Sequence, residues 1–303
     1  MSSAKLVDWL GLLALMVMFG SAFLLNKIAV VDIPPVVITA VRIVLGALIL
    51  IAMTFIQKES YSQLKSYWGL IVIISITGNC IPFFVIAWGQ QYIDSGLAGI
   101  LMGMMPLTTI VLAHFLVEGE KLTAGKVAGF ILGFIGVVIL MIPEVTFYNE
   151  SRLLHLFGIL AVLLGAVSYA VNSILVHHLP KISLTLLSAG TLIVSSIIMV
   201  PLAALEDMSW IQKVDSREVW SLMILGIFST GFATILYFRV VRHAGPSFLS
   251  QINYLVPVWA VILGITLGGE SLTIYSIIAL IVILSGIGIS QRSKVYEDSI
   301  YHD

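Results

Sequence analysis

Long apolar runs separated by short polar links make up almost the whole sequence. A helix that crosses a membrane needs about 20 predominantly apolar residues, and runs of that length recur from residue 9 to residue 291. The longest polar link, around residues 206–217, is too short to hold a soluble domain. The pattern predicts about ten membrane spans, at residues 9–30, 36–57, 67–92, 95–117, 124–142, 156–178, 183–205, 218–243, 246–268 and 271–291.

Composition agrees with this pattern. Of the 303 residues, 59% are hydrophobic and 10% are charged, whereas a soluble domain has about 25% charged residues. We therefore expect an all-α integral membrane protein. The net charge of −1 offers no basic surface for nucleic acid, and the single cysteine, Cys80, cannot form an internal disulfide. The first apolar run is longer than a signal-peptide core and lacks a clear cleavage site, so we expect it to remain as the first helix.

Lysine and arginine residues are unevenly divided between the two sides of the expected bundle. Cytoplasmic loops carry the excess of these residues in membrane proteins. The side that holds both termini collects Lys5, Lys58, Lys65, Lys121, Lys126, Lys181, Arg239, Arg242, Arg292 and Lys294. The other side collects Arg152, Lys213 and Arg217. We therefore expect both termini in the cytoplasm and the protein in the cytoplasmic (inner) membrane.

The two halves of the chain share short motifs at matching positions. GEKLT (119–123) follows the fourth expected span, and GESLT (269–273) follows the ninth. A proline precedes each motif at nearly the same distance, Pro106 in one half and Pro257 in the other. Two related halves of five helices each must insert with opposite orientation, because five is odd, and inverted repeats are typical of transporters.

The predicted architecture is therefore ten transmembrane helices arranged as two inverted five-helix repeats. We expect the first repeat in residues 1–150, the second in residues 151–291, and a cytoplasmic tail in residues 292–303.

Four stretches carry a family resemblance: FGSAFLLNK (19–27), the Pro-Pro pair followed by Arg42, the stretch 95–140 after the third span, and its repeat at 244–273. In these features the chain resembles the drug/metabolite transporter superfamily, specifically its ten-helix EamA-type members, from residue 9 to residue 291. The resemblance implies a transporter that exports amino acids, some of them aromatic, or other small metabolites. It also implies a central cavity between the halves, lined mainly by helices one, three, four, six, eight and nine.

The chain departs from the short four-helix multidrug members of that superfamily, which carry a membrane-embedded glutamate in their first helix. Here no acidic residue lies deep in a span, since Asp94, Glu118, Glu120, Glu206 and Glu218 fall at or beyond span ends. An organic cation would find no buried carboxylate to pair with. No carboxylate inside a span is available to relay protons. Multidrug-cation antiport and simple carboxylate-coupled proton exchange are therefore disfavoured.

Two cations remain inside the expected spans. Arg42 lies seven residues after Pro35, or about 10 Å into the second span at 1.5 Å per residue, where a charge costs about 3 kcal/mol on insertion scales. It could bind a substrate carboxylate, or it could hold carbonyl ends of neighbouring helices as a structural or gate residue. We favour the second role, because the resemblance does not place helix two at the cavity. Lys27 ends the first span and is expected to be an interfacial or outer-gate residue.

Asn79 lies near the middle of the third span, between Gly78 and Pro82. A proline removes a backbone donor and frees a carbonyl group one turn earlier. Irregular backbone inside a membrane is tolerated only against protein or a water-filled cavity, so we expect Asn79 to face the interior. Substrate binding and a hydrogen bond between helices both remain open for it.

Further polar and soft apolar residues extend this candidate site. Tyr169 and Asn172 are three residues apart and share a helix face, and Asn253 and Tyr254 stand just before Pro257. Methionines of the fourth span would form the opposite wall, because methionine adapts to varied apolar shapes; they are Met102, Met104 and Met105. Such a cavity suits a small amphiphile with a polar head and an apolar side chain.

Trp88 and Tyr237 occupy corresponding positions in spans three and eight, and they fit the aromatic belt at the bilayer surface slightly better than substrate stacking. The expected substrate-binding residues are Asn79, Tyr169, Asn172, Asn253, Tyr254, Trp88, Tyr237 and Met102. The expected gate or structural residues are Arg42, Lys27, Pro82, Pro106 and Pro257.

Other motifs point to packing rather than chemistry. GFILGFIG (129–136) contains GxxxG spacing, which is typical of close helix pairs; we expect it to pack on Gly286 and Gly288 of span ten rather than on a second protomer. His114, His177 and His178 lack metal-ligand spacing and are assigned to the surface or to structure. No cofactor and no metal are expected.

These observations predict a secondary transporter that moves small metabolites, most simply amino acids with apolar or aromatic side chains, outward by alternating access. The alternative is a facilitative channel or carrier for other neutral or anionic metabolites, such as nucleobases or sugars. An intramembrane enzyme is disfavoured, since no nucleophile–base pair or metal cluster is recognisable in the spans. Its partners would be a small-molecule substrate and the lipid bilayer, with no nucleic acid, and the protein would be a monomer or weak homodimer.

Overall fold

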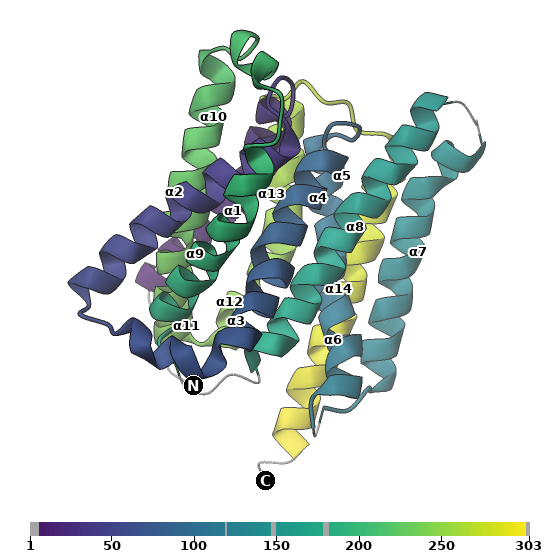
Figure 1. Cartoon of the computed structure of the whole chain (residues 1–303). Coiled ribbons are helices and arrows are strands. Elements are labelled where there is room, and N and C mark those ends of the chain that lie inside the picture. Colours follow the sequence, from purple (N-terminus) through teal and green to yellow (C-terminus); the bar gives the residue numbers. More distant parts are fainter. Residues whose placement is uncertain (1–5, 119, 147–149, 178–181, 301–303) are drawn as a thin grey trace.

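The computed structural model describes residues 6–118, 120–146, 150–177 and 182–300, and every regular element in these ranges is helical (Figure 1). The first half contains α1 (Leu6–Ala29), α2 (Pro35–Ile56), η1 (Tyr61–Tyr67), α3 (Trp68–Ser75), η2 (Ile76–Cys80), α4 (Ile81–Gly89), α5 (Ser95–Met102), α6 (Met104–Leu116) and α7 (Ala124–Thr146). The second half contains α8 (Glu150–His177), α9 (Leu184–Ala203), η3 (Met208–Gln212), α10 (Ser216–Gly226), η4 (Ile227–Phe232), α11 (Ala233–Ala244), α12 (Pro246–Leu249), α13 (Ile252–Thr266) and α14 (Ile274–Ile300).

The described residues form ten apolar helical stretches, one for each predicted span. Nine helical stretches of the described chain are long and apolar enough to cross a membrane, and a tenth, Ile252–Thr266, is shorter because span nine is interrupted after α12. Some boundaries differ from the prediction. Span three is helical from Tyr61, and α14 continues through residues 292–300, where a tail was expected. The expected boundary between the repeats adjoins residues 147–149, which lie outside the described residues.

The third and fourth spans of each half contain a segment that is not regular α-helix. In the third spans, α3 and α10 each lead into a short π-helix, η2 and η4 respectively. In the fourth spans, Gly103 separates α5 from α6, and residues 250–251 separate α12 from α13. Pro82 and Pro106 stand in the first turn after a break, whereas Pro257 lies inside α13. π-helical segments leave backbone groups outside the regular α-helical pattern and occur frequently at functional sites.

Contacts between the halves come in matched pairs. Where a span of one half packs on a span of the other, the counterparts of these two spans also pack on each other. Span three packs on span six (α4 on α8), and span one packs on span eight (α1 on α10 and α11). Span one packs on span nine (α1 on α13), and span four packs on span six (α6 on α8). The pairs α2–α9, α5–α13 and α7–α14 each join a span to its own counterpart. A two-fold relation between the halves produces this pattern.

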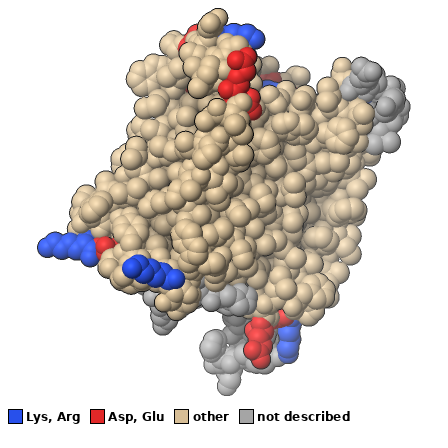
Figure 2. Space-filling model, viewed as in Figure 1, with Lys and Arg blue, Asp and Glu red and all other residues tan. Residues whose placement is uncertain are grey.

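The two halves run in opposite directions through the bundle. Helix α1 begins at the lower end of the molecule in Figure 1, whereas α8, the first helix of the second half, begins at the upper end. The charged residues visible in Figure 2 gather at these two ends, and the surface between them is apolar. Large hydrophobic side chains such as Phe134 and Ile281 are more than half exposed there. A lipid bilayer around the middle of the bundle accounts for this exposure.

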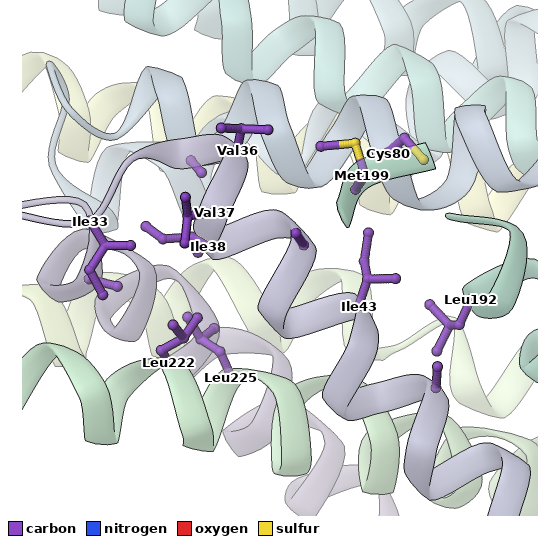
Figure 3. Close-up of a cluster of buried hydrophobic side chains, with 14 of the residues drawn as sticks. Ile33, Val36, Val37, Ile38, Ile43, Cys80, Leu192, Met199, Leu222 and Leu225 are labelled. Atoms are coloured by element: carbon purple, nitrogen blue, oxygen red, sulfur yellow. The ribbon is translucent and has the colours of Figure 1, made fainter. Parts of the chain in front are cut away.

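Helix α2 is embedded in the part of the core drawn in Figure 3. Its residues Val37, Ile38 and Ile43 contribute to a buried cluster with Leu192 of α9 and Leu225 of α10. Burial against these two helices fixes the rotation of α2 about its axis. That rotation decides where Arg42, one residue before Ile43, points.

The predicted GxxxG pairing within the chain is confirmed for α7 and α14, the most extensively packed pair of helices. A Cβ atom at Gly286 would lie 2.6 Å from the carbonyl oxygen of Gly129, so only glycine allows this approach. Gly288 does not take part in the pairing. A Cβ atom there would instead lie 3.9 Å from the hydroxyl of Tyr254.

Candidate functional site

A cavity of about 730 Å³ lies between the halves. It is bounded by residues of α1, α3, η2, α4, α5, α6, α8, η4, α11, α12 and α13, and also of α2 and α9. Helix α2 contributes Arg42, and α9 contributes side chains such as Ser188 and Thr191. The resemblance did not place helices two and seven among those that mainly line the cavity.

Most of the expected substrate-binding residues line this cavity. They are Asn79, Met102, Tyr169, Asn172, Tyr237 and Asn253. Tyr254 and Trp88 are absent from the described lining. Tyr254 packs in the cluster formed around α14 and α5, and Trp88 forms an edge-on contact with Tyr92, with ring centroids 5.1 Å apart. The structure thus brings six of the eight residues together and places these two elsewhere.

Asn79 projects from the π-helix η2. Its amide nitrogen donates to the hydroxyl of Ser195 at 3.2 Å. The same hydroxyl donates to the carbonyl oxygens of Ser75 and Thr191 at 3.2 and 2.8 Å. Asn79 therefore lies in the cavity wall and also makes a hydrogen bond between helices, from η2 to α9.

Asn172 lies directly against the same π-helix. A Cβ atom at Gly78 would be 2.7 Å from the side-chain oxygen of Asn172, so this glycine lets the backbone approach the amide. Thr77 donates to that oxygen at 3.4 Å, and Ser168 donates to the Thr77 carbonyl at 2.8 Å. Ser168 of α8 thus donates to a backbone carbonyl of the π-helix, and Asn172 of α8 accepts from the hydroxyl of Thr77.

Two of the three methionines form the expected soft wall. Met102 and Met105 line the cavity. Met104 is buried, and a Cβ atom at Gly133 of α7 would lie 2.9 Å from its sulfur. Asn253 lines the cavity on the side of α13, and its amide makes no hydrogen bond to another described residue. The cavity therefore combines apolar, adaptable surface with an available amide group.

Arg42 is the single charged residue among the described lining residues. Its Nε donates to the hydroxyl of Thr230 in η4 at 2.8 Å. Its Cζ lies 3.9 Å from the centre of the Phe83 ring, in a cation–π arrangement. Thr230 in turn donates to the carbonyl of Leu225 at 3.0 Å. The guanidinium plane is therefore held from two sides.

Asn26 and Gln90 close the cavity at one end. The Asn26 amide donates to the Gln90 side-chain oxygen at 2.8 Å, and the Gln90 amide donates to the Phe23 carbonyl at 2.8 Å. Lys27 donates to the carbonyls of Gln90 and Ile93, both at 2.9 Å. These carbonyls lie just beyond the C-terminal end of α4, where a cation is favourable. Lys27 therefore ties span one to span three at this end.

A carboxylate from the second half reinforces the closed end. Glu270, of the GESLT motif, accepts hydrogen bonds from the backbone N–H groups of Ser95 and Gly96, at 2.7 and 2.9 Å. These two residues begin α5, and a negative charge is stabilised at a helix N-terminus. In the matching GEKLT motif, Glu120 lies 3.5 Å from the ammonium group of Lys126, within its own half. The two motifs therefore differ in the contacts that they make.

The opposite end of the cavity reaches the lower end of the bundle. Its lining includes Val176, Leu184, Val241 and Leu249, which adjoin the α8–α9 and α11–α12 links. No described residue of the upper links 30–34, 91–94 or 267–273 lines it. The cavity is therefore sealed toward the upper links and extends toward the lower ones.

Asp94 sits beside the closed end, in the link before α5, with its side chain exposed and its carboxyl partly shielded from water. Burial raises the pKa of its carboxyl above the ordinary value of 3.8, and the neighbouring Glu270 carboxylate raises it further. Lys27 and His155 act in the opposite direction.

Several site residues were not singled out from the sequence. Thr230 and Ser195 position Arg42 and Asn79, and Gln90 links spans one and three. A Thr-Gly pair occurs in both η2 and η4, as Thr77-Gly78 and Thr230-Gly231, and this repetition in the sequence could have pointed to Thr230. No group of three or more His, Cys, Asp or Glu side chains that could hold a metal ion occurs in the described residues. Cys80 is a buried free cysteine.

The profile of the EamA-like transporter family matches the chain twice, at residues 8–142 and 156–291. The chain belongs to this family. The two matches correspond to the two five-span halves, and the protein is a membrane transporter built from two EamA-like repeats.

Similar proteins occur in bacteria and plants. The chain is 26% identical to the uncharacterized transporter YoaV of Bacillus subtilis over 92% of this chain and 94% of that protein. It is 26% identical to the uncharacterized inner membrane transporter YedA of Escherichia coli (strain K12), over 90% of this chain and 87% of YedA. It is 25% identical to the WAT1-related protein At3g02690 of Arabidopsis thaliana, described as chloroplastic, over 85% of this chain and 63% of that protein. A solved crystal structure superposes with a TM-score of 0.66 at 20% identity, covering 95% of this chain and 98% of the other. That likeness supports the fold.

Proposed function

We propose that this EamA-like transporter exports amino acids with apolar or aromatic side chains across the cytoplasmic membrane by alternating access. The observation that carries the proposal is the mixed lining of the cavity. Asparagine amides at Asn79, Asn172 and Asn253 line the same cavity as the soft apolar side chains of Met102 and Met105. Amides can bind the ammonium and carboxylate groups of an amino acid, and methionine accommodates side chains of different shape.

The size of the cavity supports the same class of substrate. Small-molecule sites have volumes of about 300–1,000 Å³, and a cavity of about 730 Å³ holds an amino acid together with water. Aromatic rings of Phe83 and Tyr169, whose centroids are 6.4 Å apart in an edge-on arrangement, add a surface for an aromatic side chain.

We assign the structure to the inward-facing state. The lower end, toward which the cavity extends, carries both termini and most of the Lys and Arg residues, and is therefore placed in the cytoplasm. Lys27 and Glu270 then form the outer gate, since their hydrogen bonds must break for the cavity to open outward. By the two-fold relation between the halves, Glu120 is the counterpart of Glu270. Glu120 would dock against span nine when the inner end closes.

Counterflow in proteoliposomes tests this function. Vesicles containing the purified full-length protein are loaded with unlabelled phenylalanine, leucine, alanine, uracil or glucose, and the accumulation of the matching radiolabelled compound is measured. We expect saturable counterflow of phenylalanine and leucine, and none of uracil or glucose. Alanine substitution of Asn79, Asn172 or Asn253 should each weaken substrate affinity by about 2- to 10-fold, the value of one hydrogen bond. Wild-type affinity in all three variants would place the site elsewhere.

A further inference from the structure

The guanidinium of Arg42, in the cavity wall, makes fewer hydrogen bonds than it has donors. An arginine side chain carries five N–H donors. One of them, on Nε, donates to Thr230. Within the part of the chain that the structure describes, the two terminal nitrogens donate no hydrogen bond and form no ion pair. Four donors of a permanent cation therefore remain available at the wall of the cavity.

The charge of Arg42 has no counterpart in the cavity. No Asp or Glu side chain is among the described lining residues. Arginine stays protonated in proteins, so Arg42 cannot avoid the energetic cost of an unpaired charge in the cavity by losing its proton. Thr230 and Phe83 orient the guanidinium, but both are neutral and leave its charge uncompensated. A group that enters the cavity with a negative charge would supply what the chain lacks.

The orientation of the guanidinium suits a carboxylate. The bond to Thr230 at 2.8 Å and the Phe83 ring at 3.9 Å fix the plane of the guanidinium. Thr230 is itself fixed, because it donates to the carbonyl of Leu225 at the end of α10 and lies close to Gly46 of α2. A planar fork with free terminal nitrogens matches the two oxygens of a carboxylate in a bidentate pair.

We infer that Arg42 binds the carboxylate of the transported molecule through its two terminal nitrogens. The substrates are thereby limited to small molecules with a carboxylate, either anionic or zwitterionic, and neutral nucleobases and sugars are rejected. This inference rests on the proposed transport through the cavity and names the group of the substrate that is recognised. It assigns Arg42 to the substrate site, in place of the structural or gate role that we favoured from the sequence.

A pair of probes that differ in one group tests the inference. 3-Phenylpropionate carries a carboxylate, and 3-phenylpropionamide has nearly the same shape without the charge. Their dissociation constants for the purified full-length protein in detergent are measured by ligand-dependent thermal stabilisation. We expect the wild-type protein to bind the acid roughly 10- to 100-fold more tightly than the amide, the value of a hydrogen bond to a charged group. Equal affinities for acid and amide in the wild-type protein would overturn the inference, whatever the variants do.

Substitutions then identify the residue that recognises the acid. Arg42→Gln should abolish the preference for the acid, and Arg42→Lys should keep part of it, because lysine retains the charge without the planar fork. Lys27→Gln is the matched control: it removes a cation that does not line the cavity, so the preference should persist. An acid preference of wild-type size in Arg42→Gln would overturn the assignment.

The proposed function can fail separately from this inference. If phenylalanine and leucine show no counterflow but the acid preference exists and depends on Arg42, the substrate is a different carboxylate and the Arg42 site stands. If phenylalanine counterflow is observed but the wild-type protein binds acid and amide equally, the amino-acid function stands and the Arg42 site is refuted.

Discussion

Glu270 accepts a hydrogen bond from the backbone N–H of Ser95 at 2.7 Å, and this contact joins the two repeats at the closed end of the cavity. The residues are 175 positions apart in the chain. The carboxylate also accepts from Gly96, so the N-terminus of α5 is held by one side chain of the opposite half. In the proposed mechanism, this contact breaks when the outer end opens.

Glu270→Gln should therefore shift the protein toward its outward-open state. The amide has one acceptor oxygen and no charge, so it cannot replace both charge-assisted bonds, each of which is worth about 1.5–3 kcal/mol. A cysteine at Phe23, in a Cys80→Ser background, reports the opening, since the Phe23 carbonyl accepts from Gln90 at the closed end. In intact cells, labelling by a membrane-impermeant maleimide should rise about 10-fold.

Glu120→Gln is the matched variant for this experiment. It removes the corresponding carboxylate of the other repeat, which we expect to stabilise the outward-open state. Labelling of the same cysteine should then fall below the level of the unmodified background. A rise of equal size in both variants would indicate general loosening of the bundle and would contradict the gate assignment.

The pKa of Asp94 predicts a pH effect of defined sign. Burial and Glu270 raise this pKa in the folded protein, so the ionised carboxyl destabilises the fold. The folded protein therefore gains stability as the pH falls through the raised pKa toward 3.8, and it loses that gain as the pH rises. Asp94→Asn removes the penalty. It should raise the thermal midpoint at pH 7, and the difference from the wild-type protein should shrink as the pH approaches 4.

Lys27, Glu270 and His155 are the titratable groups around Asp94, so the comparison is made between two proteins that share them. Asp215, an exposed aspartate at the start of α10 whose pKa is lowered by hydrogen bonds from Glu218 and Arg217, provides the control. Asp215→Asn should lower the thermal midpoint at pH 7. An Asp94→Asn protein less stable than wild type at pH 7 would contradict the prediction.

The number of spans, the repeats and most of the cavity residues could be predicted from the sequence. Apolar length fixes the spans, and the GEKLT and GESLT motifs fix the repeat, because both signals are local. Asn79 could be placed in the interior because Gly78 and Pro82 mark an irregular backbone, which lipid does not tolerate.

The rotation of individual helices could not be predicted in the same way. Lipid and protein core are both apolar, so the pattern on a membrane helix does not tell which face is buried. Tyr254 and Trp88 were placed at the substrate site on sequence position alone, and they lie outside the described lining. The contact of Arg42 with Thr230 joins residues 188 positions apart. It depends on the π-helix η4, which we did not predict from the local sequence.

The orientation of the protein in the membrane stays a prediction with a direct test. The excess of Lys and Arg at the lower end places both termini in the cytoplasm. A phosphatase that is active only in the periplasm, fused after Asp303, should remain inactive, whereas the same fusion in the link after Glu206 should be active. Strong phosphatase activity of the fusion at Asp303 would reverse the assignment of inner and outer gates.

The α7–α14 pair should be the most sensitive part of the bundle to added side-chain volume. Gly286→Leu pushes a side chain into the backbone of Gly129, where even a Cβ atom would be 2.6 Å from the carbonyl oxygen. Overpacking of this kind costs about 1–3 kcal/mol, which should appear as a lower thermal midpoint in detergent. Gly69→Leu is the control, because a Cβ atom there would meet nothing within 4 Å. Equal midpoints for the two variants would contradict the close packing.

The close approach of Gly78 to Asn172 in the cavity wall predicts a coupled pair of substitutions. A Cβ atom at Gly78 would lie 2.7 and 2.8 Å from the side-chain oxygen and nitrogen of Asn172, so Gly78→Ala must displace this amide. Substrate affinity should fall by about 2- to 10-fold, as when the amide is removed by Asn172→Ala. In the double variant, the alanine at position 172 leaves room for the new methyl group at position 78. Gly78→Ala should therefore add little to the loss of affinity that Asn172→Ala causes alone. Counterflow competition measures the four affinities of this cycle, and an additive loss would contradict the contact, because independent sites add and touching ones do not.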